Sequence, residues 1–116
     1  MNLQIKNLSC EIIKDEGYSP IIFTEIQGQI DQTLFFYGHY DKQPPFVGWM
    51  EGIGATNPKI IDGKLYGRGG ADDGYSTYST MLALKALQEQ GLKLPRLVMI
   101  TEGDEESGSG HMTHYL

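Results

Sequence analysis

The segment between residues 34 and 101 constrains the fold most strongly, because it predicts two strands joined by a helix. Leu34 to Tyr37 is a short apolar run, and Arg96 to Thr101 is a second one. Between them, apolar side chains recur at intervals of three and four over residues 75–90, and Gly91 ends that helix. Two strands joined in this way run parallel, and we expect both to be buried on both faces.

The remaining segments add short elements around this unit. They are two strands (9–14 and 20–27), a small hairpin (60–66) and a last short helix (111–116), separated by loops rich in glycine and proline (42–58 and 67–74). A chain of 116 residues is long enough for one domain with a modest core. We therefore expect one domain of the α/β class, with a mixed, partly parallel sheet flanked by helices.

Charge and composition exclude several classes of partner. The chain has 9 basic and 15 acidic residues and no cluster of Lys and Arg, so we expect no binding to nucleic acid. No apolar run is long enough to span a membrane, and the start of the chain, MNLQIKNLSC, lacks the apolar stretch of a signal peptide. The single cysteine, Cys10, fits a reducing compartment, so we expect a cytoplasmic location and a buried Cys10 side chain.

The acidic side chains are concentrated in three short segments rich in glycine. Seven of the 15 acids lie there: Asp41, Asp72, Asp73, Glu102, Asp104, Glu105 and Glu106. Two of these segments follow the strands of the parallel pair, and the third opens the helix between them. Ligands of open α/β sheets bind at the carboxyl ends of the strands, so we expect the three segments to meet at one edge.

The first two segments each allow a metal site and a simpler alternative. His39 and Asp41 are two residues apart, so they point the same way in an extended chain, and the carboxylate can hold the imidazole as a metal ligand. The alternative for this first segment is that His39 and Asp41 are two exposed side chains without a metal.

In the second segment, Asp72 and Asp73 repel each other unless a divalent cation lies between them. The alternative is that Asp73 caps the helix that follows.

The third segment places four acids within five residues, Glu102 to Glu106. The side chains of Glu105 and Glu106 diverge, so one can bind a metal while the other reaches the water on that metal. This division suits metal-assisted hydrolysis, and a solvated acidic helix start is the alternative. An imidazole together with carboxylates suits zinc, manganese or cobalt better than calcium.

Together the three segments resemble the aminoacylase/carnosinase family of dinuclear zinc metallopeptidases. The family pattern G-H-x-D appears as Gly38 to Asp41, G-R-G-x-x-D as Gly67 to Asp72, and E-G-x-E-E-x-G-S as Glu102 to Ser109. The resemblance covers about residues 30–116 and is strongest to the carnosinase-type dipeptidase branch, as three segments indicate: Gln43-Pro44, Gly48-Trp49 and Asp62 to Tyr66.

The resemblance implies a role for each matching residue. His39 would bind one zinc ion, Glu106 would bind a second, and Asp72 would bridge the two. Glu105 would be the general base that activates water and later protonates the leaving amine. Asp41 would support His39.

The resemblance also implies a reaction and a larger site. The substrate would be a small peptide or an N-acyl amino acid, cleaved at an amide bond beside a free carboxylate by a dipeptidase or deacylase. A complete site would hold two zinc ions, with manganese or cobalt as substitutes, and would contain a cis peptide bond between Asp72 and Asp73. The other metal ligands of the family and its lid and dimerisation domain lie downstream of Leu116. We therefore expect residues 1–116 to be a fragment of one incomplete zinc-exopeptidase-like catalytic domain.

A non-catalytic function is the competing hypothesis. Each zinc would have two protein ligands in this chain, whereas a catalytic zinc normally has three. We therefore expect weak metal binding and negligible peptidase activity from these residues alone. An uncovered sheet edge would favour a homo-oligomer.

Three further side-chain patterns carry smaller expectations. Arg68 is expected to pair with a nearby acid, with a substrate contact as the alternative. The helix face formed by Tyr75, Tyr78 and Met81 is expected to lie in the core. His111 and His114 are expected to be ordinary exposed side chains rather than a pair of metal ligands.

Overall fold

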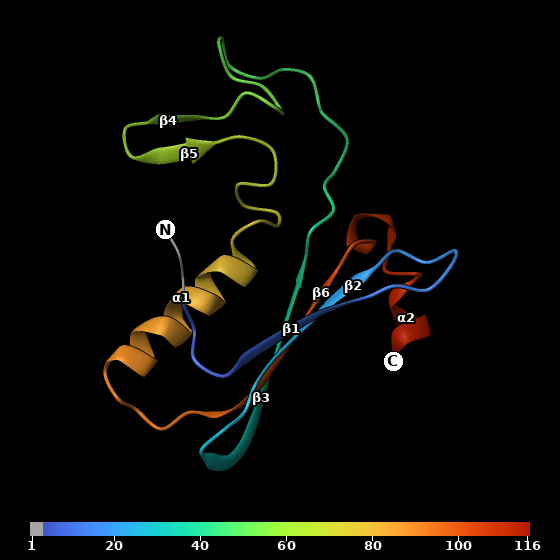
Figure 1. Cartoon of the computed structure of the whole chain (residues 1–116). Coiled ribbons are helices and arrows are strands. Elements are labelled where there is room, and N and C mark those ends of the chain that lie inside the picture. Colours follow the sequence, from blue (N-terminus) through green and yellow to red (C-terminus); the bar gives the residue numbers. More distant parts are fainter. Residues whose placement is uncertain (1–3) are drawn as a thin grey trace.

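The computed structural model describes residues 4–116, and a four-stranded sheet forms its centre (Figure 1). The strands are β1 (Leu8–Ile13), β2 (Ile21–Ile26), β3 (Ile30–His39) and β6 (Pro95–Glu102), in the spatial order β1-β2-β6-β3. β2 pairs antiparallel with both β1 and β6, whereas β3 pairs parallel with β6. The predicted mixed, partly parallel sheet is therefore confirmed.

The other elements lie in the expected places. The helix α1 (Ser76–Glu89) joins the hairpin of β4 (Lys59–Ile61) and β5 (Lys64–Tyr66) to β6, and a 3₁₀ turn, η1 (Glu105–Ser107), and a short helix, α2 (Met112–Tyr115), follow. The hairpin turns at Asp62 and Gly63, which have φ values of 49° and 74° and match the positive φ that a two-residue hairpin turn requires. Among the described residues, no helix has the length and apolar character to cross a membrane. The stretch tested for a signal peptide begins with residues 1–3, which lie outside the described part of the chain.

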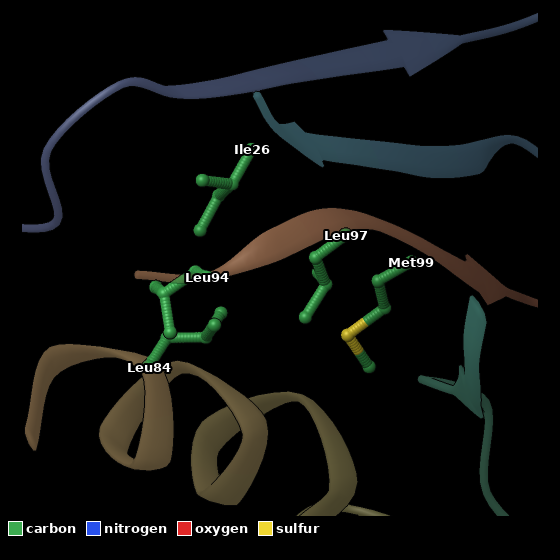
Figure 2. Close-up of a cluster of buried hydrophobic side chains, with 5 residues drawn as sticks. All are labelled: Ile26, Leu84, Leu94, Leu97 and Met99. Carbon is green, nitrogen blue, oxygen red and sulfur yellow. The ribbon is translucent and has the colours of Figure 1, made fainter. Parts of the chain in front are cut away.

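The main core lies between α1 and one face of the sheet (Figure 2). Its buried side chains are Ile26, Leu84, Leu94, Leu97 and Met99. Side chains alternate along β6, so Ile100 points to the other face, where Met112 of α2 and Ile21 cover it. Because side chains on both of its faces are covered, β6 is the best buried strand. This strand ends at the acidic segment that carries Glu105 and Glu106.

The sheet is covered only in part, and this corrects two burial predictions. β3 is an edge strand, and its side chains Leu34 and Phe35 are 48% and 60% exposed rather than buried on both faces. Tyr75 and Tyr78, expected in the core, are 59% and 53% exposed, because α1 presents only a narrow stripe to the sheet. The radius of gyration is 16.6 Å, larger than the about 13 Å of a compact chain of this length.

The outer strand on the other side of the sheet explains a third correction. Cys10 lies on β1, the opposite edge strand, and is exposed rather than buried. Its sulfur accepts a weak hydrogen bond from the Thr24 hydroxyl at 3.8 Å. Edge strands of this kind are compatible with self-association, which stays a prediction.

Candidate metal centre

The end of β3 packs directly on the beginning of α1, and this contact places His39. A Cβ atom on Gly38 would lie 2.2 Å from the Ser76 hydroxyl oxygen, so any larger residue would displace the Ser76 side chain. His39 follows and is 7% exposed. Its backbone N–H donates to Asp73 Oδ2 at 3.3 Å, which links the strand to the helix.

Asp73 binds the backbone at the start of α1, as one of the two sequence interpretations expected, but the N-cap residue itself is Tyr75, two residues further on. Asp73 Oδ1 accepts hydrogen bonds from the backbone N–H groups of Tyr75 (3.2 Å) and Ser76 (3.1 Å). Burial raises the pKa of the Asp73 carboxyl, but the hydrogen bonds from Ser76, His39 and Tyr75 together hold that pKa below its usual value. Asp73 therefore faces the helix, and its neighbour Asp72 is left to face His39.

The imidazole of His39 has carboxylates at both nitrogens. Nδ1 lies 3.2 Å from Asp41 Oδ1, and Nε2 lies 3.0 Å from Asp72 Oδ1 and 3.7 Å from Glu105 Oε2. Burial lowers the pKa of His39, but the hydrogen bond to Asp72 and the charges of Glu105 and Asp41 raise it further than burial lowers it. The three acidic segments therefore meet around one buried ring.

Glu106 completes a group of three donors. The ligand atoms of His39, Asp72 and Glu106 all lie within 4.8 Å of one another. Gln43 holds the Glu106 carboxylate through its side-chain amide and through its backbone N–H at 3.3 Å. The backbone N–H of Glu106 donates to Asp41 Oδ2 at 2.9 Å, so Asp41 contacts both the ring and the turn.

The chemistry of this donor set fits a divalent transition metal. One imidazole nitrogen and two carboxylate oxygens are donors that zinc accepts, and four carboxylates surround the ring: Asp41, Asp72, Glu105 and Glu106. A dication would offset their mutual repulsion. The carboxylate of Asp41 lies on the far ring nitrogen, where it can fix the orientation of a metal-binding imidazole.

Glu102 is a contact of the site for which the sequence interpretation gave no role. It is 2% exposed, and its Oε1 accepts hydrogen bonds from the Tyr37 hydroxyl and from Ser109 Oγ at 2.7 Å. The pKa of Tyr37 is raised to about 12, mainly by burial and next by the hydrogen bond to Glu102. Glu102 thereby ties the turn that carries Glu105 to two strands. It lies opposite His39 in the parallel register of β3 and β6, a pairing that no sequence pattern shows.

Two expectations about the second acidic segment are wrong. The described residues contain no cis peptide bond, so the bond between Asp72 and Asp73 is trans, the form favoured by about 3 kcal/mol. Arg68 forms no ion pair with any acid in residues 4–116, because its guanidinium donates instead to the backbone carbonyl of Gln43 at 3.1 Å.

The two C-terminal histidines contact the turn between β1 and β2 rather than the acidic segments' donor group. His111 Nδ1 accepts a hydrogen bond from the backbone N–H of Ser19 at 3.1 Å. His114 Nε2 lies 2.7 Å from Asp15 Oδ2, and its ring stacks on Tyr18 with centroids 3.8 Å apart. Both side chains hold the C-terminal segment against the turn between β1 and β2.

The sequence also matches a known family. Residues 35–116 match the family model described as Peptidase family M20/M25/M40. The chain belongs to this peptidase family. The match includes all three acidic segments, so the resemblance seen in the sequence is confirmed.

Named relatives of this M20 chain are metallohydrolases and dipeptidases. It is 36% identical over 97 residues to human Beta-Ala-His dipeptidase, covering 78% of this chain and 18% of that protein. It is 35% identical over 99 residues to an uncharacterized metallohydrolase of Methanocaldococcus jannaschii, covering 84% and 24%. A Cys-Gly metallodipeptidase of Candida albicans is 37% identical over 81 residues, covering 67% and 17%.

Solved structures agree with the fold. Human carnosine dipeptidase 1 superposes with a TM-score of 0.76 at 28% identity, covering 93% of this chain and 25% of that one. An M20 family metallo-carboxypeptidase from Sulfolobus solfataricus gives a TM-score of 0.79 at 26% identity, covering 93% and 24%. The M20 chain thus spans about a quarter or less of the length of these proteins. The family supports a metal-dependent hydrolase.

Proposed function

We propose that the chain carries metal-binding residues and the general base of a hydrolase that cleaves an amide bond in a small peptide. One observation carries the proposal: His39, Asp72 and Glu106, from three separate segments of an M20 family chain, have donor atoms within 4.8 Å of one another. Relatives named as dipeptidases support a dipeptide as the substrate, and N-acyl amino acids form the wider class of substrates with the same amide bond.

Each residue has a distinct part in this proposal. His39, Asp72 and Glu106 would hold the ion, and Asp41 would orient both His39 and the backbone of Glu106. A bound divalent ion polarises the substrate carbonyl and makes water lose a proton near neutral pH. Glu105 Oε2 lies 3.7 Å from His39 Nε2, and the Glu105 side chain is 40% exposed, so substrate and water can reach it. Its carboxylate would accept the proton from the attacking water and donate it to the leaving amine nitrogen.

The ion would be zinc, with manganese or cobalt as substitutes. Three donors are the number that a catalytic zinc normally takes from protein, so the group described above suffices for one ion. The resemblance implies two ions per complete site, with Asp72 between them, and the second ion would require further donors. The amount of zinc bound per chain at saturation separates these arrangements.

Zinc binding tests the donor group directly. We expect Asp72→Asn to weaken zinc affinity by about a hundredfold or more, because it removes a charged ligand at an exposed position that contributes little to folding. Asp41→Asn is expected to weaken affinity by about 10- to 100-fold through the orientation of His39. Isothermal titration calorimetry with zinc on the 116-residue chain measures both effects.

The control for these variants is Asp15→Asn, a matched change in the turn beside His114. It should leave zinc affinity unchanged. Equal affinities for Asp72→Asn and the unchanged chain would contradict the proposed site.

A non-catalytic metal-binding unit is the second candidate function. The Asp72 side chain is 75% exposed, so water reaches the donor group freely and the electrostatic gain from metal and base is reduced. On this ground we expect the 116 residues alone to bind metal weakly and to hydrolyse peptides negligibly. Dipeptide turnover by the chain alone with added zinc, lost in Glu105→Gln, would contradict this expectation.

A further inference from the structure

Lys42 directly follows Asp41, one of the four carboxylates around the His39 ring, but it forms no ion pair with any acid in residues 4–116. Its ammonium donates instead to the backbone carbonyls of Tyr40 and Asp41, each at 2.9 Å, and to the carbonyl of Asp73. An ammonium has three N–H donors, so its hydrogen-bonding capacity is used in full. Lys42 thus brings a positive charge to the site without occupying a carboxylate that a metal would need.

The contact with the Asp73 carbonyl joins two segments that are far apart in the sequence. Tyr40 and Asp41 follow β3, whereas Asp73 precedes α1, so the ammonium connects the end of the strand to the start of the helix. The residues beside these carbonyls form the donor group, because His39 precedes Tyr40 and Asp72 precedes Asp73. The 3.0 Å separation of the His39 and Asp72 side chains therefore depends on how these two segments are held.

The aliphatic stem of Lys42 is confined by the glycine-rich loop before α1. A Cβ atom on Gly69 would lie 2.4 Å from Lys42 Cε and 2.5 Å from its Cδ, so a larger residue there would displace the stem. Gly69 also has a φ of 77°, which glycine adopts without steric cost. Because the stem is half-buried and confined in this way, the ammonium has a fixed place.

We propose that Lys42 is a positioning residue that sets the separation of the proposed metal ligands His39 and Asp72. Its ammonium is a fixed cation that holds the end of β3 and the start of α1 together through three carbonyls. Lys42 acts through the backbone of these segments and contacts neither metal nor substrate. The inference rests on the proposed function, because it concerns the same donor group.

Replacing Lys42 with methionine distinguishes positioning from an effect of charge. Methionine keeps an unbranched stem but has no charge and no N–H donor, so three carbonyls lose a partner. Because an ammonium repels a nearby dication, the loss of its charge alone would strengthen zinc binding. The loss of positioning is expected to weaken zinc affinity instead, by about tenfold or more, as for other groups that orient metal ligands. Isothermal titration calorimetry on the 116-residue chain measures the direction and the size of the change.

Lys93→Met is the matched control, because it removes the same charge at an exposed position and should leave zinc affinity unchanged. Lys42→Arg keeps the charge, but a planar guanidinium cannot direct its donors as an ammonium does, so it should recover only part of the affinity. The absorption spectrum of bound Co²⁺ reports the geometry of the donors. This spectrum should change in Lys42→Met but not in Leu84→Ala, which weakens the core without altering a residue of the site.

A measurement without metal tests the carbonyl contacts themselves. An N-hydroxysuccinimide ester of acetic acid acetylates free lysine amines, and mass spectrometry resolves the rate at each lysine. Lys42 should react about tenfold or more slowly than Lys93, because all three of its N–H groups are bonded. Circular dichroism checks that each variant folds, and if Lys42→Met does not fold, Lys42→Arg and the acetylation rate decide.

Three results would overturn the inference: zinc affinity in Lys42→Met equal to or above that of the unchanged chain, an unchanged Co²⁺ spectrum in that variant, or acetylation of Lys42 as fast as that of Lys93. Failure of the proposed function gives a different result, because the unchanged chain would then bind no zinc. The acetylation rate would in that case still decide whether the ammonium holds the three carbonyls.

Discussion

Replacing Glu105 with glutamine is expected to lower peptide turnover by about 10²- to 10⁴-fold while leaving metal binding unchanged. Glutamine keeps the size of the side chain but cannot accept a proton from water at neutral pH. Glu105 Oε2 lies 3.7 Å from His39 Nε2, but Glu105 is not a member of the proposed donor group of His39, Asp72 and Glu106, so its replacement should leave the metal site intact. Turnover and metal content thus respond differently to this one change.

The protein for this measurement must turn over peptide. The chain covers 18% of human Beta-Ala-His dipeptidase, so we would insert residues 35–116 in place of the matching segment of that enzyme. Hydrolysis of its dipeptide substrate by the graft, with kcat and zinc content measured together, then tests the residues of this chain. Glu106→Gln in the same graft is expected to lose both zinc and turnover, because Glu106 is a proposed ligand.

The control is Glu89→Gln, the same chemical change at an exposed position. Glu89 pairs with Lys85 at 3.2 Å on the surface of α1, and its loss should leave kcat unaltered. A Glu105→Gln graft that hydrolyses peptide at the rate of the unchanged graft would refute the general base. A graft that binds zinc but never hydrolyses peptide would favour the non-catalytic function.

The parts of the fold that the sequence predicted are those set by local pattern. The apolar run of β6 and the spacing of three and four residues along α1 belong to single segments, and both elements form where expected. The convergence of His39 and Asp72 also follows from local order, because the end of a strand and the start of the next helix lie together in a parallel unit.

The parts that it missed depend on which segments cover which. Phe35 has the apolar character of a core residue, but nothing in residues 4–116 covers its side of the edge strand β3. Glu102 looks like one more acid in a charged segment, and only the register of β3 on β6 shows that it is buried beside Tyr37. Arg68 was expected to meet an acid, but the nearest acids turn toward His39 instead. Such pairings between distant segments are absent from any short stretch of sequence.

Replacing Met99 with alanine is expected to destabilise the chain by about 2–5 kcal/mol, a large part of the about 5–15 kcal/mol that stabilises an ordinary domain. Met99 is 0% exposed and lies at the centre of β6, packed with Leu97 and Leu84 of α1 (Figure 2). The loss combines the transfer of the missing side-chain atoms with the cavity that they leave. Urea unfolding followed by far-ultraviolet circular dichroism measures the change in the free energy of unfolding.

Met50→Ala is the matched control, because it makes the same chemical change at a side chain that is 53% exposed in the loop after β3. It should alter the free energy of unfolding by less than about 0.5 kcal/mol. Equal losses in the two variants would mean that β6 is not the centre of the core. A loss of stability in Met99→Ala alone would show that β6 is the centre of the core. Because β6 ends at Glu102 and the turn bearing Glu105 follows directly, the fold of this strand also positions the metal donors.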